Sequence, residues 1–196
     1  AVPSGDMDNA TFTDVVVSSN YADGPGNTRK KCGEVYIIFA AGIRTREFGL
    51  RGGYDPIAKT EGNGNVCFSN HTDYEFYVTL SDSKGIADLT SVDITLDPEG
   101  AGLAYRWDRG TGVFSELSDP TGCCNIDPSS SSASASGMNI TIRYGIRFGW
   151  NYPTEALQGA KLLITNASGV KVQSRYYNIY KVESDLDLIG ELGVMS

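Results

Sequence analysis

Apolar and polar side chains alternate along most of this chain, and the pattern predicts β-strands. The longest run covers residues 139–150, where apolar side chains occupy every second position and Thr141, Arg143 and Arg147 lie between them. Successive side chains of a strand point to opposite faces, so one face of this segment is expected in the core. The residues of that face are Ile140, Ile142, Tyr144, Ile146, Phe148 and Trp150.

Further strands are predicted where β-branched and aromatic residues cluster between turn residues. They cover residues 10–18, 34–40, 43–50, 74–80, 92–96 and 103–107. Residues 161–165 and 170–180 are expected to form a hairpin across the turn 166–169, where Gly169 supplies a positive φ. The segments 61–65 and 129–136 are expected to be loops, and the second of these is a low-complexity, Ser-rich stretch.

Helical signals are weak by comparison. Residues 154–158 favour a single turn after Pro153, and the capping pattern at 184–188 is cut short by Gly190 and Gly193. About ten short strands with regular spacing indicate an all-β chain folded as an antiparallel β-sandwich.

The segment 78–96, Val-Thr-Leu-Ser-Asp-Ser-Lys-Gly-Ile-Ala-Asp-Leu-Thr-Ser-Val-Asp-Ile-Thr-Leu, resembles the strand–Asp–x–x–Gly–loop–strand pattern of Ig-like domains on prokaryotic cell surfaces. Residues 161–170 are similar to the matching strand and turn near the end of such fibronectin- or cadherin-type domains, and the resemblance covers about residues 70–181. It implies an Ig-like sandwich in surface adhesion, stalks or pilus-like filaments. A fold of this kind fixes no activity.

Composition indicates the compartment of the protein and excludes some classes of partner. The 196-residue chain has a net charge of −8, which excludes a nucleic-acid partner because phosphate binding needs a basic face. No apolar run approaches the ~20 residues that span a bilayer, so no membrane span is expected. The first residues, Ala1-Val2-Pro3, are consistent with signal-peptide cleavage and an extracellular protein.

Four Asn-x-Ser/Thr tripeptides support an extracellular glycoprotein that carries N-linked glycans. Asn166 at a hairpin tip and Asn70 before a strand are expected to be accessible, whereas Asn139 begins the longest strand. The four candidate glycosylation sites are Asn9, Asn70, Asn139 and Asn166.

The four cysteines, Cys32, Cys67, Cys123 and Cys124, have no spacing typical of zinc sites. Two disulfides in an oxidising compartment are the better interpretation. Cys123 and Cys124 point opposite ways on an extended backbone, so we expect them to pair with Cys32 and Cys67 in an unassigned order.

No motif of an enzyme is present, and we expect a non-enzymatic protein with no catalytic residues and no cofactor. His71, the single histidine, lies inside a glycosylation tripeptide, so it is a poor candidate for a nucleophile–base pair. Asp82, Asp88 and Asp93 could bind calcium, but turn-shaping hydrogen bonds are the favoured role, and no metal site is predicted. Trp107 and Trp150 could stack on sugar, and core packing is the favoured role of Trp150.

The N-terminal segment suggests how such a sandwich could assemble with other copies of itself. A short apolar strand, residues 11–18, precedes a Gly/Pro-rich linker, and it could leave its own domain to complete the sheet of a neighbouring copy. Repetition of this head-to-tail contact makes a homopolymer. The alternative is that the segment is the first strand of its own sandwich. The candidate donor residues are Thr11, Phe12, Val15, Val16 and Val17.

The sequence therefore predicts an N-terminal strand and linker over residues 1–31 and one Ig-like sandwich domain over residues 32–196. The favoured function is a structural subunit of an extracellular, pilus-like filament that assembles by β-strand complementation between glycosylated copies. The alternative function is a monomeric adhesion or glycan-binding module on the cell surface.

Overall fold

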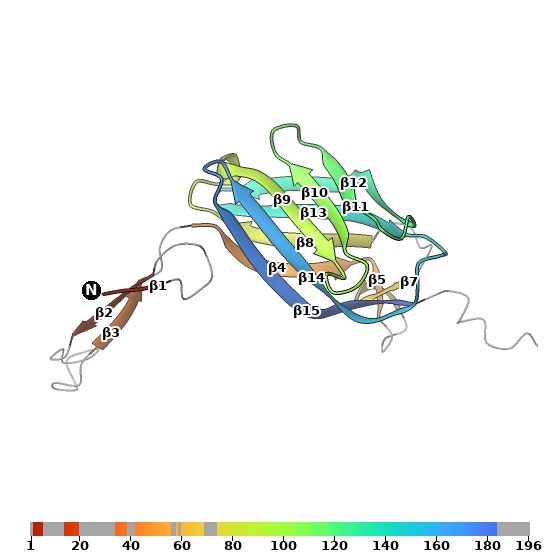
Figure 1. The fold of residues 1–196 in the computed structure, drawn as a ribbon, viewed down its shortest axis with the longest axis horizontal. Coiled ribbons are helices and arrows are strands. Elements are labelled where there is room, and N and C mark those ends of the chain that lie inside the picture. The colour runs from red at the N-terminus through yellow and green to blue at the C-terminus, as the bar shows by residue number, and fades with distance from the viewer. Residues whose placement is uncertain are drawn as a thin grey trace, which may run out of the picture.

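The computed structural model describes residues 2–5, 14–19, 34–38, 42–55, 58, 60–68 and 74–183. Two sheets packed face to face form a β-sandwich, as predicted (Figure 1). Among the described residues there is no α-helix, and one 3-10 turn, η2 (Ile86–Asp88), joins β8 to β9.

The larger sheet has eight strands, and its neighbours are antiparallel except for the parallel pair β15 and β7. Its strands, in spatial order, are β11 (Phe114–Ser118), β10 (Leu103–Asp108), β9 (Leu89–Leu96), β14 (Glu155–Asn166), β15 (Lys171–Glu183), β7 (Val66–Phe68), β5 (Gly53–Asp55) and β6 (Thr60–Gly64). The smaller sheet contains β12 (Cys124–Ser136), β13 (Asn139–Phe148), β8 (Tyr74–Ser81) and β4 (Arg44–Arg51), in this order.

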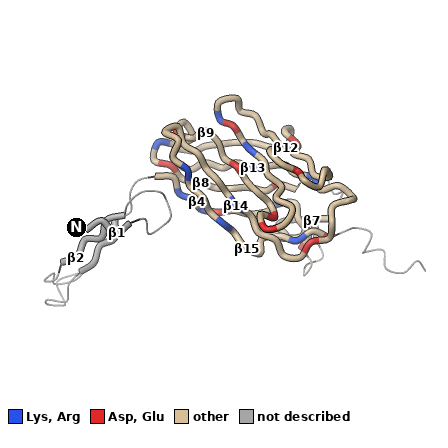
Figure 2. The backbone as a smooth tube through the Cα atoms, viewed as in Figure 1, with Lys and Arg blue, Asp and Glu red and all other residues tan. Residues whose placement is uncertain are grey.

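The core lies between the sheets, where the predicted alternation places it. In β8 the buried and half-buried positions alternate without a break, and in β13 the predicted apolar face is buried from Ile140 to Phe148. Charged residues of both signs are scattered along the described strands and loops and form no single basic stripe among them (Figure 2).

The predicted hairpin is confirmed: β14 and β15 pair through Ile164 and Val172, and Gly169 in the turn has φ 78°. Trp150, by contrast, was expected in the core and is 52% exposed. The strand ends at Phe148 because the Gly149 amide donates to Cys123 O and the chain then turns, with Tyr152 N donating to Gly149 O.

Three segments form strands where the sequence predicts loops or a helical turn. The Ser-rich stretch 129–136 belongs to β12, an edge strand, and it pairs with β13 from Ser132↔Arg143 to Ser136↔Asn139. The Ser131 hydroxyl accepts the Gly145 amide of β13 at 2.9 Å. Residues 155–158 begin β14, and residues 61–64 belong to β6. In each case pairing with a neighbouring strand overrides the weak local preference.

One side of the sandwich is sealed by contacts between the two sheets. Phe48 of β4 stacks on Tyr176 of β15, with ring centroids 5.1 Å apart, and the hydroxyls of Thr45 and Ser174 are 3.0 Å apart. The eight-stranded sheet continues past this seam into β7, β5 and β6, so β15 and β6 lie against the edge of β4. The opposite side is bordered by β11 and β12, the free ends of the two sheets.

The N-terminal strands form a sheet of their own. β1 (Val2–Gly5), β2 (Asp14–Ser19) and β3 (Glu34–Ile38) pair antiparallel in the order β1-β2-β3, and Val15 is opposite Ile38. In the described part of the chain none of them pairs with a sandwich strand. β3 falls within residues 32–196, the segment that the sequence assigns to the sandwich domain, yet its partner is β2. No helix of the described residues is long and apolar enough to cross a bilayer.

Candidate functional site

The open side of the sandwich carries an apolar groove of about 510 Å³ between β11 and β12. Trp107, Val113 and Phe114 line it from the larger sheet, and Ile86 contributes from η2. Pro128 and Ala133 line it from β12. Figure 1 shows β11 and β12 side by side at this edge, where the two sheets end.

The groove wall is fixed by packing into the core. Phe114 is only 7% exposed, and its ring meets that of Tyr144 edge to face with centroids 5.5 Å apart. The buried hydroxyl of Tyr144 donates to Val92 O at 2.7 Å, so this ring cannot rotate away without losing a hydrogen bond. Val113, at the rim, is 52% exposed. A partner would therefore meet a rigid wall with an exposed apolar rim.

The two strands at the groove differ as docking edges. β12 has a register shift between Asp127 and Ser132, and Pro128 within it lacks an amide proton, so this edge is poorly suited to strand addition. Among the described residues β11 pairs only with β10, and Leu117 on it is 48% exposed. The outer backbone groups of β11 are therefore the ones available to another strand.

The candidate donor residues lie partly in the described chain. Val15, Val16 and Val17 belong to β2, where they pair with Ile38, Ile37 and Tyr36 of β3. Thr11 and Phe12 lie outside the described residues. Within the described chain β2 is thus neither a strand of its own sandwich nor bound in the groove, and the donor role remains a prediction.

The predicted disulfides are corrected in part. Cys67, Cys123 and Cys124 are free, buried thiols, so no disulfide joins Cys67 to Cys123 or to Cys124. Burial raises the pKa of Cys67 and of Cys124, and for Cys124 the charges of Cys123 and Asp119 add to the effect. Packing encloses the thiols of Cys67 and Cys124 and keeps them in the unreactive protonated form. Cys32 lies outside the described residues, and neither of its expected partners, Cys123 and Cys124, is in a disulfide.

The loop between β11 and β12 is organised by Asp119. Its Oδ1 accepts hydrogen bonds from the amides of Thr121 and Gly122, and its Oδ2 accepts the Cys124 amide at 2.7 Å. Burial raises the pKa of this carboxyl, but the hydrogen bonds from Thr121, Cys124 and Gly122 outweigh burial and lower it. One carboxylate therefore anchors the chain as it passes from one sheet to the other.

The glycosylation candidates differ from expectation at Asn166. This residue is 6% exposed, and its Oδ1 accepts the amides of Ser168 and Val170, so the expectation of accessibility is wrong. The side chain folds back because an Asn at this position can satisfy the amides of its own turn. Asn139 is exposed at the start of β13, and Asn9 and Asn70 lie outside the described residues.

The candidate calcium ligands are not brought together. Asp93 forms a bidentate ion pair with Arg106: its Oδ1 accepts a hydrogen bond from Arg106 Nε at 2.8 Å, and its Oδ2 accepts one from Arg106 Nη2 at 2.7 Å. Asp82 accepts the Lys84 amide, and Asp88 faces the Lys84 ammonium at 3.6 Å. No group of three potential ligands that could hold a metal occurs among the described residues. His71, the candidate base, lies outside them.

Sequence reasoning missed the groove. Trp107 was considered for sugar stacking but is 4% exposed, with its ring in the groove wall. No site was predicted at Val113 and Phe114, although two apolar residues directly after the turn Gly110-Thr111-Gly112 indicate the start of a short strand. The sequence could not show that Pro128 and Ala133 of β12 lie on the other side of the groove from Val113 and Phe114.

Comparison with known proteins identifies no family: no family model and no curated protein matches the chain. Two solved structures are distantly similar. A carbohydrate-binding module of family 9 from Caldicellulosiruptor kristjanssonii, in complex with cellotriose, has 9% identity and a TM-score of 0.37, covering 75% of this chain and 88% of its own. A variant of BcpA, the major pilin subunit of Bacillus cereus, has 10% identity and a TM-score of 0.31, covering 86% of this chain and 49% of its own.

Proposed function

We propose that this protein is a non-enzymatic structural subunit of an extracellular, pilus-like filament, in which the N-terminal strand of one copy binds the β11–β12 groove of the next. The observation that carries the proposal is the unpaired edge of β11 next to an apolar groove. Among the described residues β11 pairs only with β10, and its first residue, Phe114, lines the groove.

The occupant that fits this edge is an extended apolar segment. β-strand addition needs unpaired backbone groups, which β11 offers, and pockets for alternate side chains, which the groove offers. The segment 14–19 contains Val15, Val16 and Val17 and pairs with no strand of the sandwich among the described residues. A contact of this kind is heterologous, so it repeats head to tail and yields an open polymer.

Deletion and groove variants test the proposal. The full chain is expected to sediment as filaments visible by negative-stain electron microscopy, and a chain lacking residues 1–19 is expected to remain a soluble monomer. Val113→Asp is expected to reduce filament yield at least about tenfold, because a buried unpaired charge at the rim opposes docking. Trp150→Asp is the matched control, since both side chains are 52% exposed and Trp150 lies outside the groove lining.

If the deletion variant polymerises normally, strand complementation is wrong. If Val113→Asp assembles as well as Trp150→Asp while the deletion blocks assembly, the donor strand binds elsewhere than in this groove.

A further inference from the structure

A second candidate site lies on β14 and β15, where their pairing is interrupted. Ala160 is opposite Tyr176 and Gln158 is opposite Tyr180. Between these two pairs the chain advances by two residues in β14 and by four residues in β15. The extra residues form a bulge, and Asn178 within it has φ 55°, a left-handed conformation that Asn tolerates. Bulges of this kind redirect side chains and are over-represented next to binding and catalytic sites.

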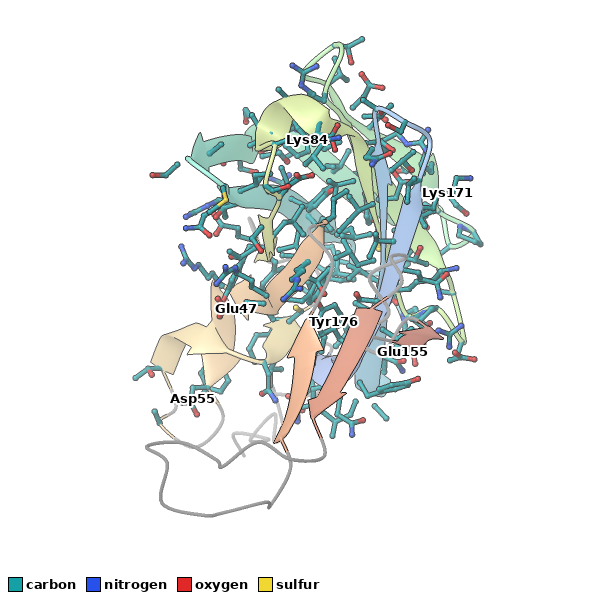
Figure 3. The ribbon with its side chains drawn as sticks, turned by 90° about the vertical axis from the view of Figure 1, so that its left-hand side faces the viewer. Glu47, Asp55, Lys84, Glu155, Lys171 and Tyr176 are labelled. Atoms are coloured by element: carbon teal, nitrogen blue, oxygen red, sulfur yellow. The ribbon has the colours of Figure 1, made fainter. Side chains whose placement is uncertain are left out.

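The bulge projects Tyr177 into solvent. This side chain is 72% exposed, the highest value among the exposed large apolar side chains of the described residues. Its neighbour Tyr176 points the other way and is held by stacking on Phe48 (Tyr176 is labelled in Figure 3). A ring this exposed leaves its face accessible to a ligand.

The two tyrosines border a pocket of about 250 Å³. Gly159 lets the strands approach closely at its base, because a Cβ atom there would lie 2.5 Å from Tyr176 O. The lining residues are Pro98, Glu99, Leu157, Gln158, Gly159, Ala160, Arg175, Tyr176, Tyr177 and Asn178. The volume lies just below the about 300–1,000 Å³ of sites for drug-sized ligands, so it suits one ring-sized group.

Three polar side chains of the pocket, those of Arg175, Glu99 and Gln158, are hydrogen-bonded, and the charges of the pocket balance. Arg175 Nη1 donates to Glu99 Oε1 at 2.5 Å, and the pKa of Arg175 is raised by this hydrogen bond, by the Glu99 charge and by a further hydrogen bond with Tyr177. Gln158 Nε2 donates to Glu155 Oε2 at 3.1 Å, which orients its amide. Among the lining residues Arg175 and Glu99 are the charged ones, so the pocket carries no net charge.

We propose that this pocket binds a neutral pyranose sugar within a glycan. A pyranose ring presents one flat C–H face, which fits against an exposed aromatic ring such as Tyr177, and a rim of hydroxyls that both donate and accept. The guanidinium of Arg175, the carboxylate of Glu99 and the amides of Gln158 and Asn178 offer planar donors and acceptors to adjacent hydroxyls.

The same observations disfavour other ligands. An anionic ligand would find the Arg175 charge already neutralised by Glu99. A purely apolar ligand would remove water from the ion pair and the two amides without replacing the hydrogen bonds that water makes to their remaining donors and acceptors. The site is separate from the β11–β12 groove, since the two linings share no residue, and it does not depend on filament assembly.

The test uses the full-length protein on an array of neutral oligosaccharides built from glucose, galactose, mannose and N-acetylglucosamine, followed by calorimetric titration with the best binder. Wild type is expected to bind at least one of them saturably. Tyr177→Ala and Arg175→Ala are expected to weaken binding by about tenfold or more. Trp150→Ala, which removes an exposed aromatic ring outside the pocket, is the matched control and should bind as wild type does.

The variants change exposed side chains, so circular dichroism should show an unchanged fold and make the affinities comparable. Absence of binding to every neutral oligosaccharide overturns the proposal. So does binding in which Tyr177→Ala retains the wild-type affinity, or in which Trp150→Ala loses as much affinity as Tyr177→Ala.

Discussion

At the scale of the residue, Asn166 combines a glycosylation signal with a structural task. The tripeptide marks it as an acceptor, but its Oδ1 holds the amides of Ser168 and Val170 inside the β14–β15 turn. An enzyme that attaches glycan needs the side-chain amide presented in an extended, accessible segment. Asn139 offers that exposure at the start of β13, and Asn166, 6% exposed, does not.

We therefore expect glycan at Asn139 and none at Asn166. When the chain is expressed in a host that carries out N-glycosylation, Asn139→Gln should lower the intact mass by one glycan and Asn166→Gln should leave the glycan content unchanged. Glycopeptide mass spectrometry checks both sites. A glycan found on Asn166 would show that the turn opens or forms after modification.

At the scale of the element, the β11–β12 loop depends on the ionised carboxylate of Asp119. Hydrogen bonds from Thr121, Cys124 and Gly122 lower its pKa below the unfolded value of about 3.9. A carboxyl with a lowered pKa in the folded state stabilises the fold above the unfolded pKa. That stabilisation is lost as the pH falls through the folded value.

The stability of wild type should therefore fall as the pH drops below about 4, and part of this loss should disappear in Asp119→Asn. At pH 7 the variant should be less stable by about 1–2 kcal/mol, since an amide accepts fewer of the loop hydrogen bonds. Urea unfolding at pH 7, 4 and 3 measures both effects. Parallel pH profiles for the two proteins would exclude a role of the Asp119 charge.

At the scale of the whole molecule, aromatic rings from both sheets meet around Phe148. This side chain of β13 is fully buried and lies 6.4 Å from the Tyr180 ring of β15 and 4.9 Å from the Tyr152 ring, between centroids. Phe76 of β8 meets Tyr180 edge to face at 5.2 Å. The two sheets are thus joined through rings whose positions depend on one another.

Phe148→Ala should lower the free energy of unfolding by about 3–5 kcal/mol, because it leaves a cavity among aromatic rings from both sheets. Urea denaturation of purified variants is the measurement. Tyr177→Ala should change stability by less than about 0.5 kcal/mol, since its ring is in solvent. A loss below about 1 kcal/mol for Phe148→Ala would mean that the neighbouring rings close the cavity.

The alternation of residues 139–148 and 74–80 determined the β-class and the buried faces, because a period of two is a local property of the strand. The turn 166–169 with Gly169 determined the β14–β15 hairpin. Local signals failed at the strand ends. Trp150 continues the alternation, but the chain turns at Gly149 and Trp150 lies outside the sheet. The segment Ser129–Ser136 has little intrinsic preference for a strand, but it becomes one because it pairs with β13.

Neither candidate site could be read from the chain alone. The groove needs β11 and β12 to be edge strands of two different sheets, and the pocket beside Tyr177 needs a bulge created by the register between β14 and β15. Sheet order and register depend on which distant segments pack together, whereas the periodic pattern records only which face of each strand avoids water. The sequence by itself therefore determined what is buried, and the tertiary structure decided which edges and pockets remain open.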